Sequence, residues 1–259
     1  MIMTTQSGRS LFVDRRYNGP VASGNGGYSA GLAARLVAGD DEAVEATLRA
    51  PVPLDQRLRV QETVDGVNIL TDDAANRILV MSLRSTHLDT PQIASPGLAA
   101  ASIAAASFRG AEDHALPTCF VCGPAREPGD GLRIFPDFVS GKGDATNPNP
   151  FPIVASPWTP TSDLADADGR VAREFVWAAL DCPGAFAVDK EPILLGRMSA
   201  QILDRPRPDD ACVVVAWARG SDRRKHFAGT ALFSARGDLL AFSEQTWIQI
   251  EAHAHTLKA

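Results

Sequence analysis

Asp181 is the residue in this chain best placed to do chemistry. It follows a run of six apolar residues, Phe175–Leu180, and stands just before Pro183-Gly184. A helix that is apolar on every side must be wrapped by other structure, so we predict a buried helix from about Ala172 to Cys182. Burial raises the pKa of a carboxyl group and suits it to acid–base work. The alternative is that Asp181 caps a backbone group at the helix end.

The glycine-rich stretch Gly24–Gly39 is the second candidate. Its small residues and the spacing of Leu32 and Leu36 predict a helix. Glycines in the first turn, Gly26 and Gly27, leave the backbone N–H groups unobstructed, and such donors attract an anion or a polarised carbonyl oxygen. Alternatively, these positions permit a close helix–sheet contact that only glycine tolerates.

The four cysteines give a third pattern. Cys119 and Cys122 have the spacing of zinc ligands or of a redox pair, but no second Cys-x-x-Cys follows. Cys182 and Cys212 could in principle supply two more ligands. The alternative, which we adopt, is that the pair are ordinary reduced thiols at a loop–strand junction and that no metal is bound.

Composition narrows the function class. The chain has 259 residues, of which 45% are hydrophobic and 22% charged, as in a globular protein with a real core. The formal net charge of −6 argues against a nucleic-acid partner. No apolar run is long enough to span a membrane, and the polar start lacks the apolar segment of a secretion signal. We expect a cytoplasmic protein without membrane contact.

The first half reads as a helix followed by an antiparallel meander. A brief strand is predicted at Leu11–Val13, and the turn Asp65-Gly66 predicts a hairpin. The alanine-rich segment Gly97–Phe108 predicts a connecting helix. The four strands that follow the first helix are expected near residues 43–50, 56–64, 67–72 and 77–84.

The second half repeats this order. A short strand is expected at Leu132–Pro136, a loop at Ser140–Pro150 and an extended segment from Ile153 to Trp158. After the helix that carries Asp181, four strands are expected at residues 193–203, 212–218, 226–234 and 239–251. Both halves therefore read as one helix and four antiparallel strands.

A small repeat supports an internal duplication. Pro51–Asp55 and Pro206–Asp210 are both Pro-x-Pro-x-Asp turns, and each falls between the first and second strands of its half. We expect two α+β units, at residues 1–110 and 111–259, each with a central helix wrapped by an antiparallel sheet.

Three motifs resemble a known family. Gly24–Leu32 is similar to the Gly-Gly helix start of hotdog thioesterases, Cys119–Gly123 with Gly131-Leu132 resembles a Cys-x-x-Cys-Gly…Gly-Leu motif of their relatives, and Val176–Asp181 is similar to the helix that carries the family's acid. The chain therefore resembles a tandem, or double, hotdog protein. The resemblance spans nearly the whole chain.

The departures from the family pattern are complementary. Asn25 replaces the family's His, Arg173-Glu174 stands where a second Gly-Gly is expected, and Ala33-Ala34 stand where a first acid is expected. In paired hotdog units one unit supplies the helix-start N–H groups and its partner supplies the acid. The resemblance thus implies one composite site and one inactive twin.

The resemblance implies an acyl-CoA thioesterase-like hydrolase. Asp181 would act as general base or nucleophile, and the N–H groups of Gly26 and Gly27 would hold the oxyanion. Asn25 would orient the water or serve as a helix N-cap. Tyr28 and Trp177 are candidates for lining an acyl tunnel, or they are core residues. Coenzyme A would take part as a portion of the substrate, with no separate cofactor.

The basic cluster Arg223-Arg224-Lys225 could meet the phosphates of coenzyme A, or it is a solvated hairpin turn. The competing function is a catalytically inert acyl or acyl-CoA-binding module, which the missing His favours. A hotdog hydratase requires a His paired with the acid, and neither helix carries one. The expected partner is a small-molecule acyl thioester, and hotdog units commonly pair into a homodimer.

Overall fold

The computed structural model describes residues 1–259 except 6–7, 40, 140–151, 191 and 251–259. Within these residues twelve strands form one sheet, in the order β1-β2-β4-β5-β6-β3-β9-β12-β11-β10-β8-β7. The strands of the first half are β1 Ile2–Thr5, β2 Gly8–Phe12, β3 Ala43–Leu48, β4 Arg57–Thr63, β5 Gly66–Thr71 and β6 Leu79–Thr86. Those of the second half are β7 Asp137–Phe138, β8 Ile153–Trp158, β9 Ile193–Ile202, β10 Cys212–Asp222, β11 Lys225–Ser234 and β12 Leu239–Gln249.

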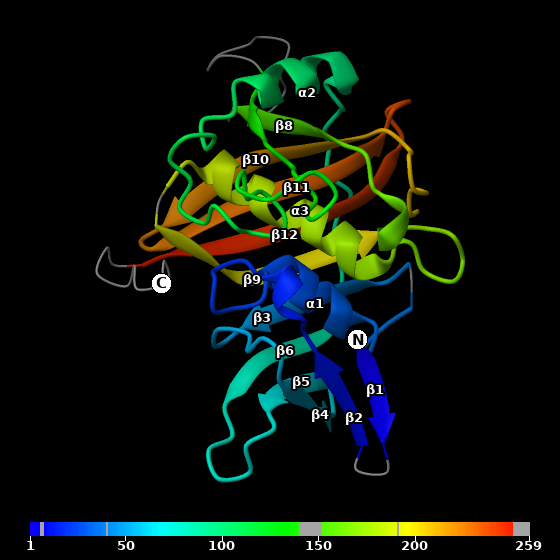
Figure 1. The fold of residues 1–259 in the computed structure, drawn as a ribbon, viewed down its shortest axis with the longest axis vertical. Coiled ribbons are helices and arrows are strands. Elements are labelled where there is room, and N and C mark those ends of the chain that lie inside the picture. Colours follow the sequence, from blue (N-terminus) through cyan, green and yellow to red (C-terminus); the bar gives the residue numbers. More distant parts are fainter. Residues whose placement is uncertain (6–7, 40, 140–151, 191, 251–259) are drawn as a thin grey trace.

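Three α-helices and two short 3₁₀ turns complete these elements. They are α1 Gly26–Ala34, α2 Gly97–Ala106, α3 Arg173–Val188, η1 Arg15–Tyr17 and η2 Ser162–Leu164. Helices α1 and α3 lie side by side in the middle of the molecule, and the sheet curves around them (Figure 1). Strand β3 pairs with β9, so the two halves share one continuous sheet.

The predicted order of helix and four strands is present in both halves. Helix α1 is followed by β3 to β6, and α3 by β9 to β12. The meander prediction needs one correction, because in each half the first strand pairs with the fourth rather than with the second. This crossover encloses the helix, which a simple meander would not do.

Hydrogen bonds show the internal duplication more sharply than the sequence does. Gly24 N donates to Val52 O (2.9 Å), and Val171 N donates to Pro206 O (2.9 Å). The turns η1 and η2, and the N-cap positions Asn25 and Ala172, are related by the same spacing along the chain. That spacing carries Gly27 to Glu174 and Ala34 to Asp181. The two units are therefore equivalent in backbone and differ in the side chains at these positions.

The buried helix predicted around Asp181 is confirmed, but it does not stop at Pro183. Helix α3 continues to Val188 and ends at Asp189 in a left-handed conformation (φ 54°). Pro183 has no N–H to donate to the preceding turn, a loss that ordinarily breaks a helix. The carbonyl that loses its helical partner is Ala179 O. The next carbonyl, Leu180 O, accepts from Gln245 Nε2 of β12 (2.6 Å), and Gly184 leaves the space that Gln245 fills.

Other predicted elements differ at their edges. Residues 132–136 form no strand: Arg133 is left-handed (φ 52°), and Leu132 N and Ile134 N donate to the loop carbonyls Phe120 O and Val121 O. Among the described residues, β7 is the strand found in this segment before residue 140. Strand β1 was not predicted, and the loop predicted at 140–150 lies outside the described residues. Short strands at a sheet edge carry few residues of alternating pattern, so the sequence signal is weak there. The division at residues 110 and 111 remains a prediction.

Helix α2 lies on the outside of the sheet, against β8 and β10 (Figure 1). Its buried residues are Ala101 and Ala104, and Ala101 joins a separate apolar cluster with Val213, Val215 and Phe233 on the outer sheet face. The connecting segment thus covers sheet surface that would otherwise be exposed, and it stays away from α1 and α3.

The contact between α1 and α3 depends on glycine. A Cβ on Gly31 would lie 2.6 Å from Trp177 Cβ and 2.9 Å from Glu174 Cα. Trp177 is 1% exposed and ranks among the largest fully buried side chains. The close helix–sheet contact that was the alternative explanation of the first-turn glycines is present at Gly26, where a Cβ would lie 2.9 Å from Leu195 Cδ2 of β9. Gly27 and Gly31 approach the helix α3 instead.

We expect Gly31→Ala to lower the free energy of unfolding by about 1–3 kcal/mol, because overpacking outweighs the helix preference of alanine. Urea denaturation measures the change. Gly39→Ala is the matched control, since a Cβ there meets no described atom within 4 Å. Equal stability of the two variants would show that α1 and α3 do not approach this closely.

Candidate active site

A cavity of about 300 Å³ lies where the two halves meet. The first half contributes the helix start around Asn25 and Gly26 and the segment 48–52, and the second contributes Asp181 and parts of β9 and β12. Most of the wall is apolar: Leu48, Pro51, Val52, Leu116, Ile193, Leu194, Leu195, Trp247, Ile248 and Ile250. Such a pocket suits an apolar ligand held by a few polar groups.

Asp181 reaches this cavity from α3. Its Oδ2 accepts a hydrogen bond from Gly27 N at the start of α1 (2.9 Å). Its Oδ1 is buried and has no hydrogen-bond partner among the described residues. A Cβ on Gly27 would lie 2.5 Å from Asp181 Cβ, so only glycine permits this approach. One carboxylate oxygen is thus fixed by the other half of the chain, and the other oxygen is unpaired.

The surroundings of Asp181 place its titration near neutrality. Burial raises its pKa to about 7, and the hydrogen bond from Gly27 N–H opposes this rise. The nearby Cys119 raises the pKa further, whereas the amide of Asn25 lowers it. A carboxyl group with such a pKa can exchange a proton with water at physiological pH.

Asn25 is the N-cap of α1, as one of the two explanations predicted. Its Oδ1 accepts from Tyr28 N (2.9 Å). Its Nδ2 points towards sulfur, 3.9 Å from both Cys119 Sγ and Cys182 Sγ. Asn25 is 2% exposed and lines the cavity, so its side chain fixes the helix start beside Asp181.

Three of the four cysteines gather next to this site. The sulfur atoms of Cys119, Cys122 and Cys182 lie within 4.8 Å of one another, and all three residues are buried, free thiols. Cys212 is separate, with its Sγ against Asp210 O (3.5 Å). The sequence raised Cys182 as a partner for the pair, and the fold brings it there.

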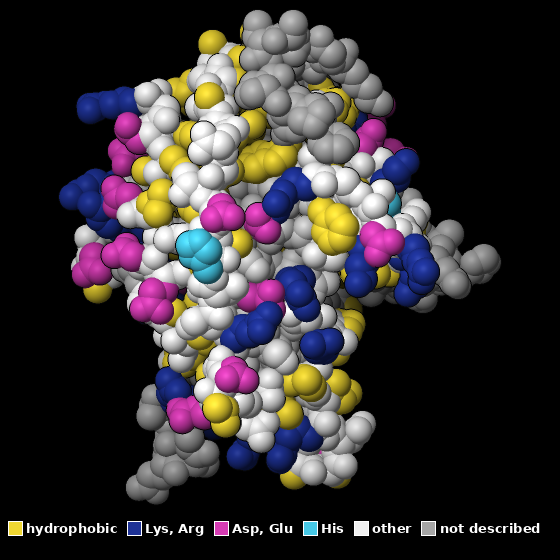
Figure 2. Space-filling model, turned by 180° about the vertical axis from the view of Figure 1, so that it is seen from behind, with side chains coloured by type: hydrophobic (Ala, Val, Ile, Leu, Met, Phe, Trp, Pro, Cys, Tyr) yellow, Lys and Arg dark blue, Asp and Glu magenta, His cyan; other side chains and the backbone are white. Residues whose placement is uncertain are grey.

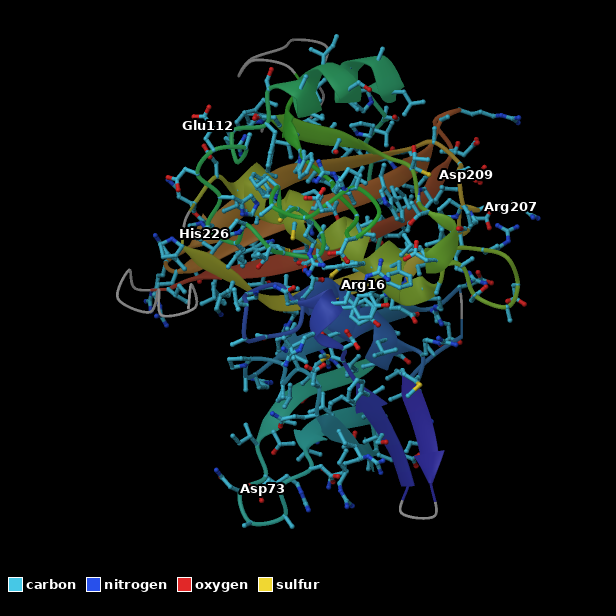
Figure 3. The ribbon with its side chains drawn as sticks, in the orientation of Figure 1. Arg16, Asp73, Glu112, Arg207, Asp209 and His226 are labelled. Carbon is cyan, nitrogen blue, oxygen red and sulfur yellow. The ribbon has the colours of Figure 1, made fainter. Side chains whose placement is uncertain are left out.

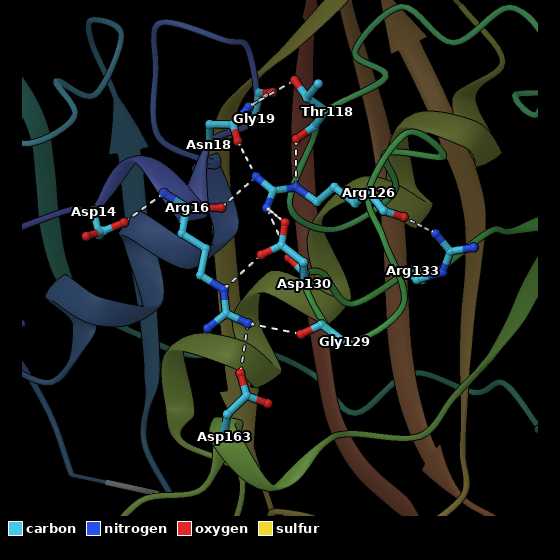
Figure 4. A network of polar contacts seen from close by, with 10 residues as sticks. All are labelled: Asp14, Arg16, Asn18, Gly19, Thr118, Arg126, Gly129, Asp130, Arg133 and Asp163. Carbon is cyan, nitrogen blue, oxygen red and sulfur yellow. Dashed lines mark hydrogen bonds and ion pairs between the residues drawn. The ribbon is translucent and has the colours of Figure 1, made fainter.

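The Cys119 loop is held in place by arginine side chains. Arg126 donates to Thr118 O (2.8 Å), Arg16 O (2.6 Å) and the side chain of Asn18, as Figure 4 shows. Arg16 in turn pairs with Asp163 (2.8 Å). Because this network joins η1, the loop and η2, it fixes the loop relative to the starts of both central helices.

The remaining predicted site residues do not line the cavity. Tyr28 is buried and stacks on Tyr17, with ring centroids 4.2 Å apart, and Trp177 packs against Gly31. Arg223 and Arg224 form the exposed turn between β10 and β11. That turn adjoins the cavity wall, because Gln249 N donates to Arg224 O and Lys225 pairs with Ile248.

Sequence reasoning missed two features of the site. The β12 residues Trp247 and Ile248 form part of the cavity wall, and Gln245 receives the indole N–H of Trp247 (2.8 Å). A signal was present, since Gln245 is a polar residue at an inward-facing position of a strand. The contribution of β9 through Leu195 carried no distinctive residue type.

Comparison with known proteins supports the architecture. No protein-family model and no curated protein matches the chain. Solved structures do: an acyl-CoA thioesterase II from Mycobacterium marinum has a TM-score of 0.57 at 12% identity and covers 96% of this chain and 94% of its own.

Two further structures agree with this match. A TesB protein from Mycobacterium avium subspecies paratuberculosis has a TM-score of 0.55 at 16% identity, covering 90% of this chain and 89% of its own. A hot dog fold protein of unknown function from Alicyclobacillus acidocaldarius has a TM-score of 0.54 at 14% identity, covering 94% and 93%. The predicted fold is thus confirmed: the chain has an α+β double hotdog fold, similar to that of these structures.

The remaining sequence expectations concern the partner, the membrane and the location of the protein. On the face shown in Figure 2, acidic and basic side chains are interspersed rather than gathered by sign. Among the described residues no helix is long and apolar enough to cross a membrane. The cytoplasmic location and the homodimer remain predictions.

The pKa of Asp181 predicts a pH-dependent stability. Its value rises from 3.8 to about 7 on folding, so between these pH values the folded protein holds a proton that the unfolded chain has lost. The free energy of unfolding therefore falls as pH rises through this window, by at most about 4 kcal/mol.

In Asp181→Asn this contribution is absent. We expect the variant to be more stable than the parent at pH 8, and the difference to shrink as pH falls towards 4. Denaturant titrations of both proteins across this range measure it. A difference that stays constant with pH would contradict the raised pKa.

Proposed function

We propose that the chain is an acyl-CoA thioesterase-like hydrolase with a single composite site. The observation that carries the proposal is Asp181, which lines a mostly apolar cavity and whose Oδ1 is buried without a hydrogen-bond partner among the described residues while Oδ2 is fixed by Gly27 N–H. An unpaired buried carboxylate oxygen costs stability, and such groups concentrate at functional sites.

The cavity suits the acyl part of a thioester. Its volume of about 300 Å³ lies at the small end of ligand sites, and its wall is built from aliphatic side chains and Trp247. The similar Mycobacterium marinum protein is described as an acyl-CoA thioesterase. At this low identity the likeness supports the fold, and the assignment of substrate rests on the cavity itself.

We assign the chemistry as general-base hydrolysis. Asp181 Oδ1 removes a proton from water, and the water oxygen attacks the thioester carbonyl carbon. The tetrahedral intermediate then collapses, its C–S bond breaks, and the departing thiolate takes the proton back from Asp181. The pKa of about 7 allows the same carboxyl group to act in both directions.

The N–H groups of Gly26 and Gly27 have different roles in this proposal. Gly27 N–H already binds Asp181, so its role is to orient the carboxylate. Gly26 precedes it in the first turn of α1 and lines the cavity, which leaves its N–H as the donor for the developing oxyanion. The positive end of the α1 dipole adds to the same stabilisation.

The basic turn Arg223–Lys225 is the proposed contact for the coenzyme A phosphates. It adjoins Ile248 and Gln249 at one end of β12. Arg207 and Asp209 lie at the opposite end of this sheet from His226, as Figure 3 shows. With the phosphates at the basic turn, the acyl chain would enter the cavity and the nucleotide part of coenzyme A would stay outside it.

An inert acyl-binding module is the second candidate. It is favoured by Asn25, which stands where the related motif has His and which is engaged as an N-cap. The two candidates differ at Asp181, because only hydrolysis requires the carboxylate. Ligand binding without turnover across a broad panel of acyl thioesters would establish the binding module.

We expect Asp181→Asn to lower kcat by roughly 10² to 10⁴, the usual contribution of general-base catalysis. In the parent protein kcat/KM should rise with pH through about 7, since the base must be ionised. Glu174→Gln is the matched control, a second buried acid on α3 that does not line the cavity. Unchanged turnover by Asp181→Asn would remove this residue from the mechanism.

The basic turn has its own test. Replacing Arg223, Arg224 and Lys225 together by Gln should raise KM for an acyl-CoA by up to about tenfold, because exposed ion pairs each contribute little. KM for the same acyl group on a short thiol without phosphates should not change. Arg207→Gln serves as control at the far end of the sheet, and an equal rise for both thioesters would contradict a phosphate contact.

A further inference from the structure

No step of the proposed hydrolysis uses a sulfur atom of the three-cysteine cluster beside Asp181. Cys119 Sγ and Cys182 Sγ are 3.7 Å apart, and Cys122 Sγ completes a group within 4.8 Å. All three thiols are free, and the exposed fraction is 1% for Cys119, 3% for Cys122 and 8% for Cys182. Three adjacent buried thiols from two distant segments are capable of chemistry of their own.

Two of these thiols are reachable from the cavity. Cys119 and Cys182 both line it, together with Asp181 and Asn25. Cys182 directly follows Asp181 in α3, and Cys119 stands in the loop fixed by Arg126. A small reagent that enters the substrate cavity therefore meets this pair of sulfur atoms.

The local hydrogen bonds make the pair unequal. Hydrogen bonds from the thiols of Cys122 and Cys182, and from the N–H groups of Cys122 and Val121, hold the pKa of Cys119 below its usual value. The pKa of Cys182 is raised, chiefly because its proton is shared with Cys119. Asn25 Nδ2 adds a donor to the sulfur of Cys119. A sulfur with a lowered pKa next to a neutral thiol is the arrangement that favours oxidation to a disulfide.

A bound metal ion fits this place less well than oxidation does. A structural zinc site takes four protein ligands, and among the described residues three sulfur atoms gather here. A disulfide needs two of these sulfur atoms and no further ligand.

We propose that Cys119 and Cys182 are an oxidation site, which forms a reversible disulfide when a peroxide enters the cavity. Cys119 thiolate attacks a peroxide oxygen and becomes a sulfenic acid, and hydroxide leaves and takes up a proton. Cys182 sulfur then attacks the sulfenic sulfur, and water leaves. Overall two thiols lose two electrons and two protons, and one hydrogen peroxide becomes two waters.

The disulfide alters the surroundings of Asp181. The two sulfur atoms must approach from 3.7 Å to about 2.05 Å, which draws the Cys119 loop onto α3. Asn25 Nδ2 contacts both sulfur atoms, so the start of α1 is disturbed as well. Oxidation should therefore suppress hydrolysis. This consequence rests on the proposed function, whereas the disulfide itself does not.

The test treats the reduced, full-length protein with hydrogen peroxide and maps its peptides by mass spectrometry without reduction. We expect a Cys119–Cys182 cross-linked peptide that dithiothreitol removes. Cys122→Ser and Cys212→Ser should keep the cross-link, and Cys119→Ser and Cys182→Ser should lose it. Mapping of the unaltered protein decides the question even if a variant fails to fold.

Other results would overturn the proposal. These are a Cys119–Cys122 cross-link, stable sulfinic acid without a cross-link, or one equivalent of zinc in the purified protein that protects the thiols until a chelator is added. A separate assay compares acyl-CoA hydrolysis before and after oxidation, with at least a tenfold loss expected and recovery in dithiothreitol. Because the mapping needs no substrate, failure of the hydrolase assignment leaves the disulfide result intact.

Discussion

The arrangement of the two central helices and of the candidate site depends on the hydrogen bond from Gly27 N–H to Asp181 Oδ2. It joins the two halves of the chain at the crossing of α1 and α3. It requires glycine at position 27, a helix start aimed at the acid, and a partner helix buried on every side. The surrounding sheet, shared through β3 and β9, holds the two helices in this relation.

The same hydrogen bond helps to set the pKa of Asp181 in its apolar surroundings. Burial pushes the pKa of Asp181 up and the N–H donor pulls it down, and the balance falls near neutrality. A fully satisfied carboxylate would be a structural cap, and a carboxyl group without any donor would stay protonated. One oxygen of Asp181 is bonded and the other has no partner among the described residues, so the side chain is anchored while one oxygen keeps its capacity to accept a hydrogen bond.

Much of this was predictable because it lies in short segments. The apolar run before Asp181 predicts a wrapped helix, and the glycines predict a close contact or a donor site; both explanations hold in part. The contact of Gln245 with Leu180 O beside Pro183 was not predictable, because Gln245 comes from a distant strand. The third sulfur of the cysteine cluster depends likewise on where the Cys119 loop meets α3. Both features depend on contacts between segments that are far apart in the sequence, and the local sequence pattern of one segment does not predict such contacts.

The two halves of the duplicated chain differ at the positions that form the candidate site. The position equivalent to Gly27 is Glu174, and the position equivalent to Asp181 is Ala34. At that twin location Glu174 is buried and pairs with Arg35 (3.6 Å), so the place of a donor is taken by a charge pair. In a symmetric pair of units every change would affect both sites. Within one chain the halves can diverge, and Gly31 and Gly27 on α1 then make room for Trp177 and Asp181 on α3. The differences between the two halves thus provide the packing that positions Asp181.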